Sequence, residues 1–429
     1  MARLRDQLLS TYAAEAINLL SGLTFGIISA RALGPEGRGV VAAIWAAITI
    51  GMMVSSFGIA KSLISRLNDR EIDLTGSDFY GGLIVLLPVL ALVSWAIIIP
   101  LAPPSLVGDA WILAIVVLIV PVMLVTDFAR SVLRARRRIY LLNGIVAVSA
   151  IARVVVIVTL WHFDEVNVAT VLMIEAGFWT FTGAIACAAL WRSILRVPRF
   201  SSMGGAIRSL LSYGLMFQAY SLLFNMINKI SVPALSALSG SEVTGHFAVS
   251  LRMAEYLGTF TNQIIFVFVP LLAQKEEKIA AFEYAIKLTR ISVIFLVPAG
   301  ALLSISADWL IPLLYGEAFA PAIAPFRVMV AAIVAATLFQ FTGMAAVATG
   351  DLKAVTICAG IGLAVNAVLM ILLIPRHGAL GAGISAAFGH SVALGTHVIA
   401  LKVRCHVAIA DVLVPSPRDL RSARRRFNA

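Results

Sequence analysis

The stretch Ala32-Leu-Gly-Pro-Glu-Gly-Arg-Gly-Val-Val-Ala-Ala43 has a partial copy in the second half of the chain, Leu238-Ser-Gly-Ser-Glu-Val-Thr-Gly-His-Phe-Ala-Val249. Each copy lies between two long apolar runs, so each is predicted to be the tight turn of a membrane-spanning helical hairpin. Glycine permits the left-handed backbone of such a turn, proline suits a first helical position, and glutamate favours the positive end of the following helix. The position of the two copies in the two halves indicates an internal duplication. The aligned identical pairs are Gly34/Gly240, Glu36/Glu242, Gly39/Gly245 and Ala42/Ala248.

The composition is that of a membrane protein. Of 429 residues, 60% are hydrophobic and only 13% are charged, whereas soluble domains carry about 25% charged residues. The formal net charge of +11 does not indicate nucleic-acid binding, because the basic residues form short clusters between the apolar runs. The three cysteines are far apart and supply neither a disulfide framework nor a metal-binding pattern.

Twelve apolar runs are long enough to span a bilayer, which takes roughly 20 residues. The connections on one side of the membrane are all short, so no extramembrane domain is expected to carry chemistry. The predicted spans are residues 11–32, 39–61, 80–102, 110–129, 140–161, 167–191, 210–235, 245–271, 289–313, 322–347, 354–374 and 379–401.

The basic residues alternate between the two sides of these spans. If the N-terminus is cytoplasmic, 26 of the 33 Lys and Arg residues fall in cytoplasmic segments. The opposite face carries only Arg31, Arg38, Arg327 and Arg376. The positive-inside rule therefore predicts that both termini are cytoplasmic.

Each half has six spans, an even number, so both halves begin on the same side of the membrane. The repeat is therefore predicted to be parallel. The predicted fold is an all-α integral membrane protein, with twelve transmembrane helices in two six-helix lobes around a central cavity. The predicted parts are an N-terminal lobe (1–191), a cytoplasmic linker (192–209), a C-terminal lobe (210–401) and a basic tail (402–429). The tail is expected to contact anionic lipids, and Gln274–Arg290 is expected to form an amphipathic helix on the inner membrane surface.

Familiar catalytic signatures are absent from the sequence. It contains no phosphate-binding loop of the ATPase type, so we expect no bound cofactor, no ATP-driven pump and no enzyme. His390 and His397 share a helix face, but they have no carboxylate or cysteine nearby, so no metal site is predicted. Three glycine-rich stretches, beginning at Gly22, Gly360 and Gly378, are interpreted as surfaces for close helix packing.

Ionisable residues inside the spans carry the functional hypothesis. Each costs on the order of 3 kcal/mol at mid-bilayer, so several must face protein or water. One interpretation is pairing, of Arg153 with Glu175 and of Arg252 with Glu255, which leaves Lys229 and Arg31 without an evident partner. The other is a mildly positive, water-filled cleft for an anionic substrate, since guanidinium groups match phosphate geometry. The candidate substrate-binding residues are Arg31, Arg153, Lys229 and Arg252, and the candidates for ion coupling or charge pairing are Glu15, Glu175 and Glu255.

Four stretches resemble the polysaccharide transporters, or O-antigen flippases, of the multidrug/oligosaccharidyl-lipid/polysaccharide exporter superfamily. The first is the hairpin turn that begins at Arg31, and the second runs from Leu238 to Arg252. Leu313-Leu-Tyr-Gly-Glu-Ala-Phe-Ala-Pro-Ala322 is similar to the Tyr-Gly-x-x-Phe outer loop of the family. Leu373-Ile-Pro-Arg-His-Gly-Ala-Leu-Gly-Ala-Gly-Ile-Ser385, together with Asn366, is similar to the connection between its last two spans.

The resemblance implies a two-lobed transporter in the bacterial inner membrane that alternates between inward- and outward-open forms. Its implied substrate is a polyprenyl-pyrophosphate-linked oligosaccharide for O-antigen, capsule or exopolysaccharide assembly, and its implied partners include a polysaccharide polymerase and glycosyltransferases. The lipid II flippases are relatives with fourteen spans, and twelve spans argue against that branch. Three alternatives stay open: a multidrug exporter of the same fold, a membrane polysaccharide polymerase, and a scaffold for a synthesis complex.

Overall fold

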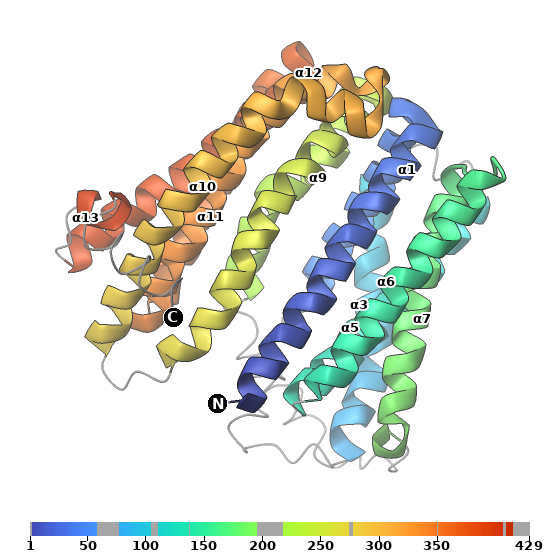
Figure 1. Cartoon of the computed structure of the whole chain (residues 1–429), viewed down its shortest axis with the longest axis horizontal. Helices are drawn as coiled ribbons and strands as arrows, with labels where there is room; N and C mark the ends of the chain where they lie inside the picture. Colours follow the sequence, from blue (N-terminus) through green and yellow to red (C-terminus); the bar gives the residue numbers. More distant parts are fainter. Residues whose placement is uncertain are drawn as a thin grey trace. The chain divides into compact units, whose positions relative to one another are not determined.

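The computed structural model is helical throughout the part of the chain that it describes (Figure 1). It describes residues 2–57, 77–103, 110–136, 138–194, 218–273, 278–349, 351–405 and 409–414. The chain divides into two compact units, Met1–Gln218 and Ala219–Ala429. Unit 1 contains α1 (Ala2–Ser55), α3 (Ser77–Leu101), α5 (Ala110–Ala135), α6 (Ile139–His162) and α7 (Val168–Ile194). Unit 2 contains helical residues 218–229, α9 (Ser231–Ala273), α10 (Lys278–Tyr315), the 3-10 helix η2 (Glu317–Ala322), α11 (Ile323–Thr349), α12 (Leu352–Cys405) and α13 (Ile409–Leu413).

Eight helices in the described part are long and apolar enough to cross a membrane. Large apolar side chains also remain exposed on them, as on α10, where Leu302, Ile305 and Trp309 are exposed. Such apolar outer surfaces suit contact with lipid. The prediction of an all-α, multi-pass membrane protein is therefore confirmed. The eight helices are Ser10–Ser55, Ala110–Arg134, Ile139–His162, Val168–Leu190, Gln218–Thr259, Phe282–Tyr315, Glu317–Met344 and Leu352–Arg404.

The two repeated glycines interrupt two of these long helices. Gly34 in α1 has φ 65° and ψ −178°, and Gly240 in α9 has φ 84° and ψ 175°. This backbone region is essentially restricted to glycine. A Cβ at either position would meet nothing within 4 Å, so the backbone conformation, rather than lack of space, requires glycine. The prediction that both glycines adopt a left-handed turn is confirmed.

The interruption at Gly240 reverses the chain direction. Lys229 and Glu255 are 26 residues apart, and their Nζ and Oε1 atoms lie 2.7 Å from each other. In one straight helix these residues would be roughly 39 Å apart, at 1.5 Å per residue. The two arms on either side of Gly240 must therefore fold back on each other as a hairpin.

A third interrupted helix is α12, which also folds back on itself, at Gly378, where φ is 49°. A Cβ on Gly362 would meet the Ala393 side chain at 2.8 Å, and a Cβ on Gly389 would meet that of Asn366 at 2.8 Å. Gly362 therefore faces Ala393, whereas Asn366, later in the first arm, faces Gly389, earlier in the second arm. This order of contacts shows that the two arms of α12 are antiparallel. The packing interpretation is confirmed for Gly362, whereas Gly378 forms the turn itself. Gly26 has nothing within 4 Å of its Cβ position, so the described residues give it no packing partner.

Two of the predicted helix boundaries are wrong. The predicted surface helix at Gln274–Arg290 is not separate, because α10 runs without a break from Lys278 into the membrane span. Its Ile286 and Leu288 side chains are buried in a core cluster with Phe341 of α11 and Val412 of α13, and this packing continues the helix. The fourth span was predicted to end at residue 129, but α5 continues to Ala135. The predicted linker lies almost entirely outside the described residues.

Candidate functional site

Arg153 of α6 is buried inside unit 1 and is fully engaged by its neighbours. Its Nη1 donates to Glu175 Oε1 of α7 at 3.2 Å, and the two side chains are only 8% and 14% exposed. Its guanidinium also lies over the rings of Phe178, at 4.6 Å, and Phe25, at 5.4 Å. The interpretation of Arg153 and Glu175 as a neutral pair is confirmed.

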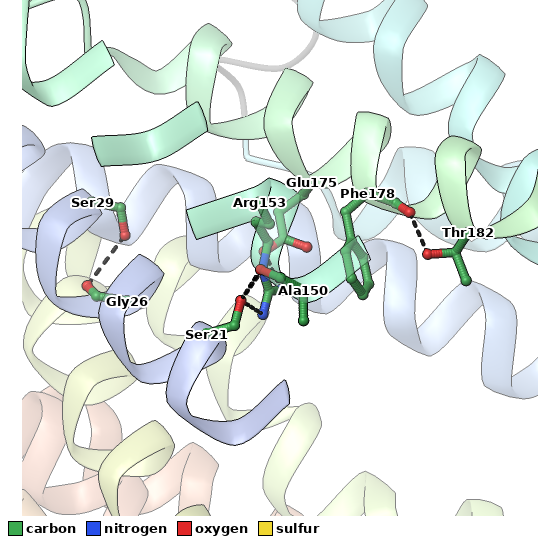
Figure 2. Close-up of polar contacts among 8 residues, drawn as sticks. All are labelled: Ser21, Gly26, Ser29, Ala150, Arg153, Glu175, Phe178 and Thr182. Atoms are coloured by element: carbon green, nitrogen blue, oxygen red, sulfur yellow. Dashed lines mark hydrogen bonds and ion pairs between the residues drawn. The ribbon is translucent and has the colours of Figure 1, made fainter. Parts of the chain in front are cut away.

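Ser21 of α1 completes this network, as Figure 2 shows. Its hydroxyl donates to the Ala150 carbonyl at 2.7 Å and accepts from Arg153 Nε at 3.2 Å and Nη2 at 3.1 Å. A hydroxyl can donate once and accept twice, so this one is saturated. The network ties α1, α6 and α7 together and leaves Arg153 with three of its nitrogens already bonded.

The charged cluster of unit 2 is built differently. Lys229 donates to Glu255 Oε1 at 2.7 Å, and Arg252 Nη1 lies 3.6 Å from Oε2 of the same carboxylate. The hairpin at Gly240 brings the three side chains together. Lys229 therefore does have a partner, contrary to the sequence-based expectation, because Glu255 lies opposite it on the returning arm.

This cluster, Lys229–Glu255–Arg252, combines excess positive charge with exposure. Two cations share one carboxylate, and the Lys229, Glu255 and Arg252 side chains are 27%, 20% and 49% exposed. The Arg252 guanidinium also lies 5.3 Å from the centre of the Tyr256 ring, which holds it in a cation–π contact. A cluster with one surplus positive charge and an exposed guanidinium can accept an anion without losing its internal ion pairs.

The remaining predicted residues stand apart from both clusters. Arg31 is exposed near the Gly34 turn of α1. Glu15 is half-buried in α1 and interacts electrostatically with Arg130 of α5. The described residues contain no group of three His, Cys, Asp or Glu side chains that could hold a metal ion.

The two histidines of α12 have separate partners. His390 Nε2 lies 3.0 Å from Asn228 Oδ1, and its ring is 5.4 Å from that of Phe224. His397 Nε2 lies 3.2 Å from the Thr342 carbonyl oxygen. Each histidine therefore ties α12 to a different neighbouring segment.

Sequence reasoning missed the partners that lie far away along the chain. Ser21 and Arg153 are 132 residues apart, and nothing in a single span shows which of its serines faces an arginine. The aromatic faces of Phe25 and Phe178 were missed for the same reason. Glu175 and Phe178 are three residues apart and therefore share a helix face, but this spacing does not identify which cation lies against them.

Known structures share this fold. The lipid II flippase MurJ in an inward-closed conformation matches with a TM-score of 0.73 and 12% identity, over 91% of this chain and 87% of that chain. An inward-facing multidrug resistance MATE family transporter of the MOP superfamily matches with a TM-score of 0.69 and 14% identity, over 91% and 94%. A MOP superfamily transporter from Pyrococcus furiosus matches with a TM-score of 0.55 and 12% identity, over 93% and 94%. The chain therefore has the fold of these MOP superfamily transporters.

A family model described as polysaccharide biosynthesis protein matches residues 28–324, which is more than half of the chain. The chain belongs to this polysaccharide biosynthesis protein family. The resemblance inferred from the sequence is thus confirmed. No curated protein matches the chain.

Proposed function

We propose that the protein is a flippase that moves a polyprenyl-pyrophosphate-linked oligosaccharide across the bacterial inner membrane. The polysaccharide biosynthesis family supports the pathway. The fold that the chain shares with MurJ, described as a lipid II flippase, supports a lipid-linked substrate. The product serves O-antigen, capsule or exopolysaccharide assembly, where a polymerase and glycosyltransferases act on the same carrier.

The observation that carries this proposal is the surplus positive charge of the Lys229–Glu255–Arg252 cluster. A pyrophosphate that crosses hydrocarbon faces a desolvation penalty of tens of kcal/mol in the Born limit. Fixed cations beside its path offset that penalty, and a guanidinium binds phosphate oxygens through two parallel N–H groups. An exporter of cationic drugs would instead be served by surplus negative charge.

The proposed mechanism is alternating access in a two-lobed bundle of twelve spans, with the cationic residues facing a central cavity. In this proposal, the three interrupted helices α1, α9 and α12 supply two crossings each, and α3, α5, α6, α7, α10 and α11 supply one each. In this mechanism Lys229 and Arg252 contact the pyrophosphate, Arg31 meets it near the outer face, and Glu255 keeps the two cations in position. Arg153, whose hydrogen bonds are used within unit 1, supports the shape of that unit.

Complementation tests the proposal. The gene is expressed in a strain that lacks its own flippase, and surface polysaccharide is measured together with the amount of folded protein in the membrane. We expect restored export with the wild-type chain and none with a Lys229→Ala, Arg252→Ala double variant present at the same level. Normal export by that variant would refute a phosphate-binding role for the cluster.

The orientation is tested separately by labelling single introduced cysteines in intact cells. An impermeant reagent is expected to reach positions 164–167 and 316–320 and to miss positions 134–138, because the basic residues predict that the last of these are cytoplasmic. Labelling of positions 134–138 would reverse the proposed topology.

A further inference from the structure

A second arginine of unit 1, Arg130 of α5, lies where the sequence placed a cytoplasmic loop. It belongs to the candidate span Ala110–Arg134. Its guanidinium lies 6.0 Å from the centre of the Trp179 ring of α7, at the outer limit for a cation–π contact. Because α5 continues past residue 129, this arginine is held inside the helical bundle of unit 1.

Helices α5 and α7 pack closely against each other one turn before Arg130. A Cβ on Gly183 of α7 would collide with the Thr126 hydroxyl of α5, so glycine allows the two helices to approach closely there. The Thr126 Oγ1 lies 2.7 Å from the Val122 carbonyl oxygen and 3.2 Å from that of Trp179. Thr126 and Arg130 are four residues apart and share a helix face, so the close contact at Thr126 places Arg130 beside the Trp179 ring.

Arg130 differs from Arg153 in how its N–H groups are used. A guanidinium carries five N–H donors. The Nε of Arg130 is buried without a partner among the described residues, whereas Arg153 donates to Ser21 and Glu175. A buried donor without an acceptor is unfavourable. An anion that reached this N–H group would supply the missing acceptor.

Charged side chains on two helices surround Arg130. It interacts electrostatically with Asp127 and Arg134 on its own helix and with Glu15 of α1. Arg134, one turn further towards the end of α5, is exposed and adds a second guanidinium on the same side of the helix.

We propose that Arg130 and Arg134 form a second phosphate-binding site, on unit 1, which takes the pyrophosphate group of the lipid-linked substrate. This inference rests on the proposed function and adds a contact separate from the unit 2 cluster. Trp179 and the Thr126–Gly183 contact position Arg130, and Arg134 supplies the exposed charge. Two guanidinium groups about 6 Å apart along the helix axis can each bind one phosphate of a pyrophosphate.

The test uses the purified full-length chain in detergent, with inorganic pyrophosphate as the probe and Trp179 as the reporter. Pyrophosphate is expected to change the tryptophan fluorescence of the wild-type chain, and this change is expected to be absent from a Trp179→Phe variant. Arg130→Gln is expected to weaken pyrophosphate binding at least tenfold, and Arg130→Lys to weaken it less. Arg138→Gln is the matched control, because it removes the same charge from an exposed side chain at the same end of unit 1. The Arg138 Nη1 donates to the Ala189 carbonyl. Wild-type affinity in Arg130→Gln would overturn the proposal.

Two further arms separate the substrate from an ordinary lipid headgroup. In vesicles of phosphatidylcholine with and without phosphatidylglycerol, the Trp179 signal is expected to be the same. A signal produced by phosphatidylglycerol alone, combined with normal polysaccharide export by Arg130→Gln, would assign the site to a lipid headgroup and overturn the proposal. If Arg130→Gln exports normally while the Lys229 and Arg252 variants do not, the unit 1 site is refuted and the flippase function stands.

Discussion

Arg153 of unit 1 and Arg252 of unit 2 differ in burial and in how their charge is neutralised. In unit 1, Arg153 is 8% exposed, faces one carboxylate and bonds Ser21 through two of its nitrogens. In unit 2, Arg252 is 49% exposed and shares its carboxylate with Lys229. Burial with complete bonding makes a cation part of the fold, whereas exposure beside a second cation suits a cation to bind an anion. The comparison predicts that changes to the Arg153–Glu175 pair alter stability and that changes to the Lys229–Glu255–Arg252 cluster alter transport.

The largest effect is expected from Arg153→Ala, because it leaves Glu175 buried without its cation. Removing one partner of a buried ion pair costs about 3–5 kcal/mol. Folded protein in the membrane, measured by size-exclusion chromatography after solubilisation, should fall sharply. An Arg153→Met, Glu175→Leu double variant should recover it, since no unpaired charge remains. Normal accumulation of Arg153→Ala would show that the pair does not support the fold.

Single Lys229→Ala and Arg252→Ala variants come next. Each removes one of the two cations around Glu255, so the rate of export should fall about 10- to 100-fold. This corresponds to a loss of roughly 1.4–2.8 kcal/mol of transition-state stabilisation. Protein level should stay close to that of the wild type, because both side chains are partly exposed. Lys229→Arg, which keeps the charge, should retain much of the activity. Equal losses in Lys229→Arg and Lys229→Ala would indicate that shape rather than charge matters.

The turn glycines provide a comparison in which the two units should behave alike. Gly34→Ala and Gly240→Ala each force a side chain into a backbone region that favours glycine, at a cost of about 1–3 kcal/mol. Thermal unfolding of the purified variants should show similar losses. Gly26→Ala is the control, because its Cβ position is open and its φ is not positive. Unequal losses at Gly34 and Gly240 would argue against the duplicated turn.

The smallest effect is expected from Glu255→Gln. The two cations then lose their shared counter-charge, so inorganic pyrophosphate should bind more tightly. A partly exposed ion pair contributes roughly 1 kcal/mol, so the affinity should rise by up to about fivefold. Isothermal titration calorimetry of the purified variant would measure this. Weaker binding would mean that Glu255 positions the cations more than it neutralises them.

The sequence was sufficient for features that depend on local backbone chemistry. The turns at Gly34 and Gly240 follow from glycine, proline and glutamate in short order, and counting residues at 1.5 Å each placed Arg153 and Glu175 at one depth. Their partner Ser21 and the Lys229–Glu255 bridge depend on how helices rotate against each other, which residue spacing within one span does not set. Arg130 was missed because a basic cluster follows it, so the predicted span ended too early.

In the proposed mechanism, the unit 2 cluster contacts the pyrophosphate of the substrate and the Arg153–Glu175 pair does not. Flipping of a polyprenyl-pyrophosphate oligosaccharide can be measured in proteoliposomes that contain equal amounts of each folded variant. The Arg153→Met, Glu175→Leu variant is expected to flip the substrate at close to the wild-type rate, and the Lys229→Ala, Arg252→Ala variant is expected not to flip it. Flipping by the second variant at the wild-type rate would contradict the proposed mechanism.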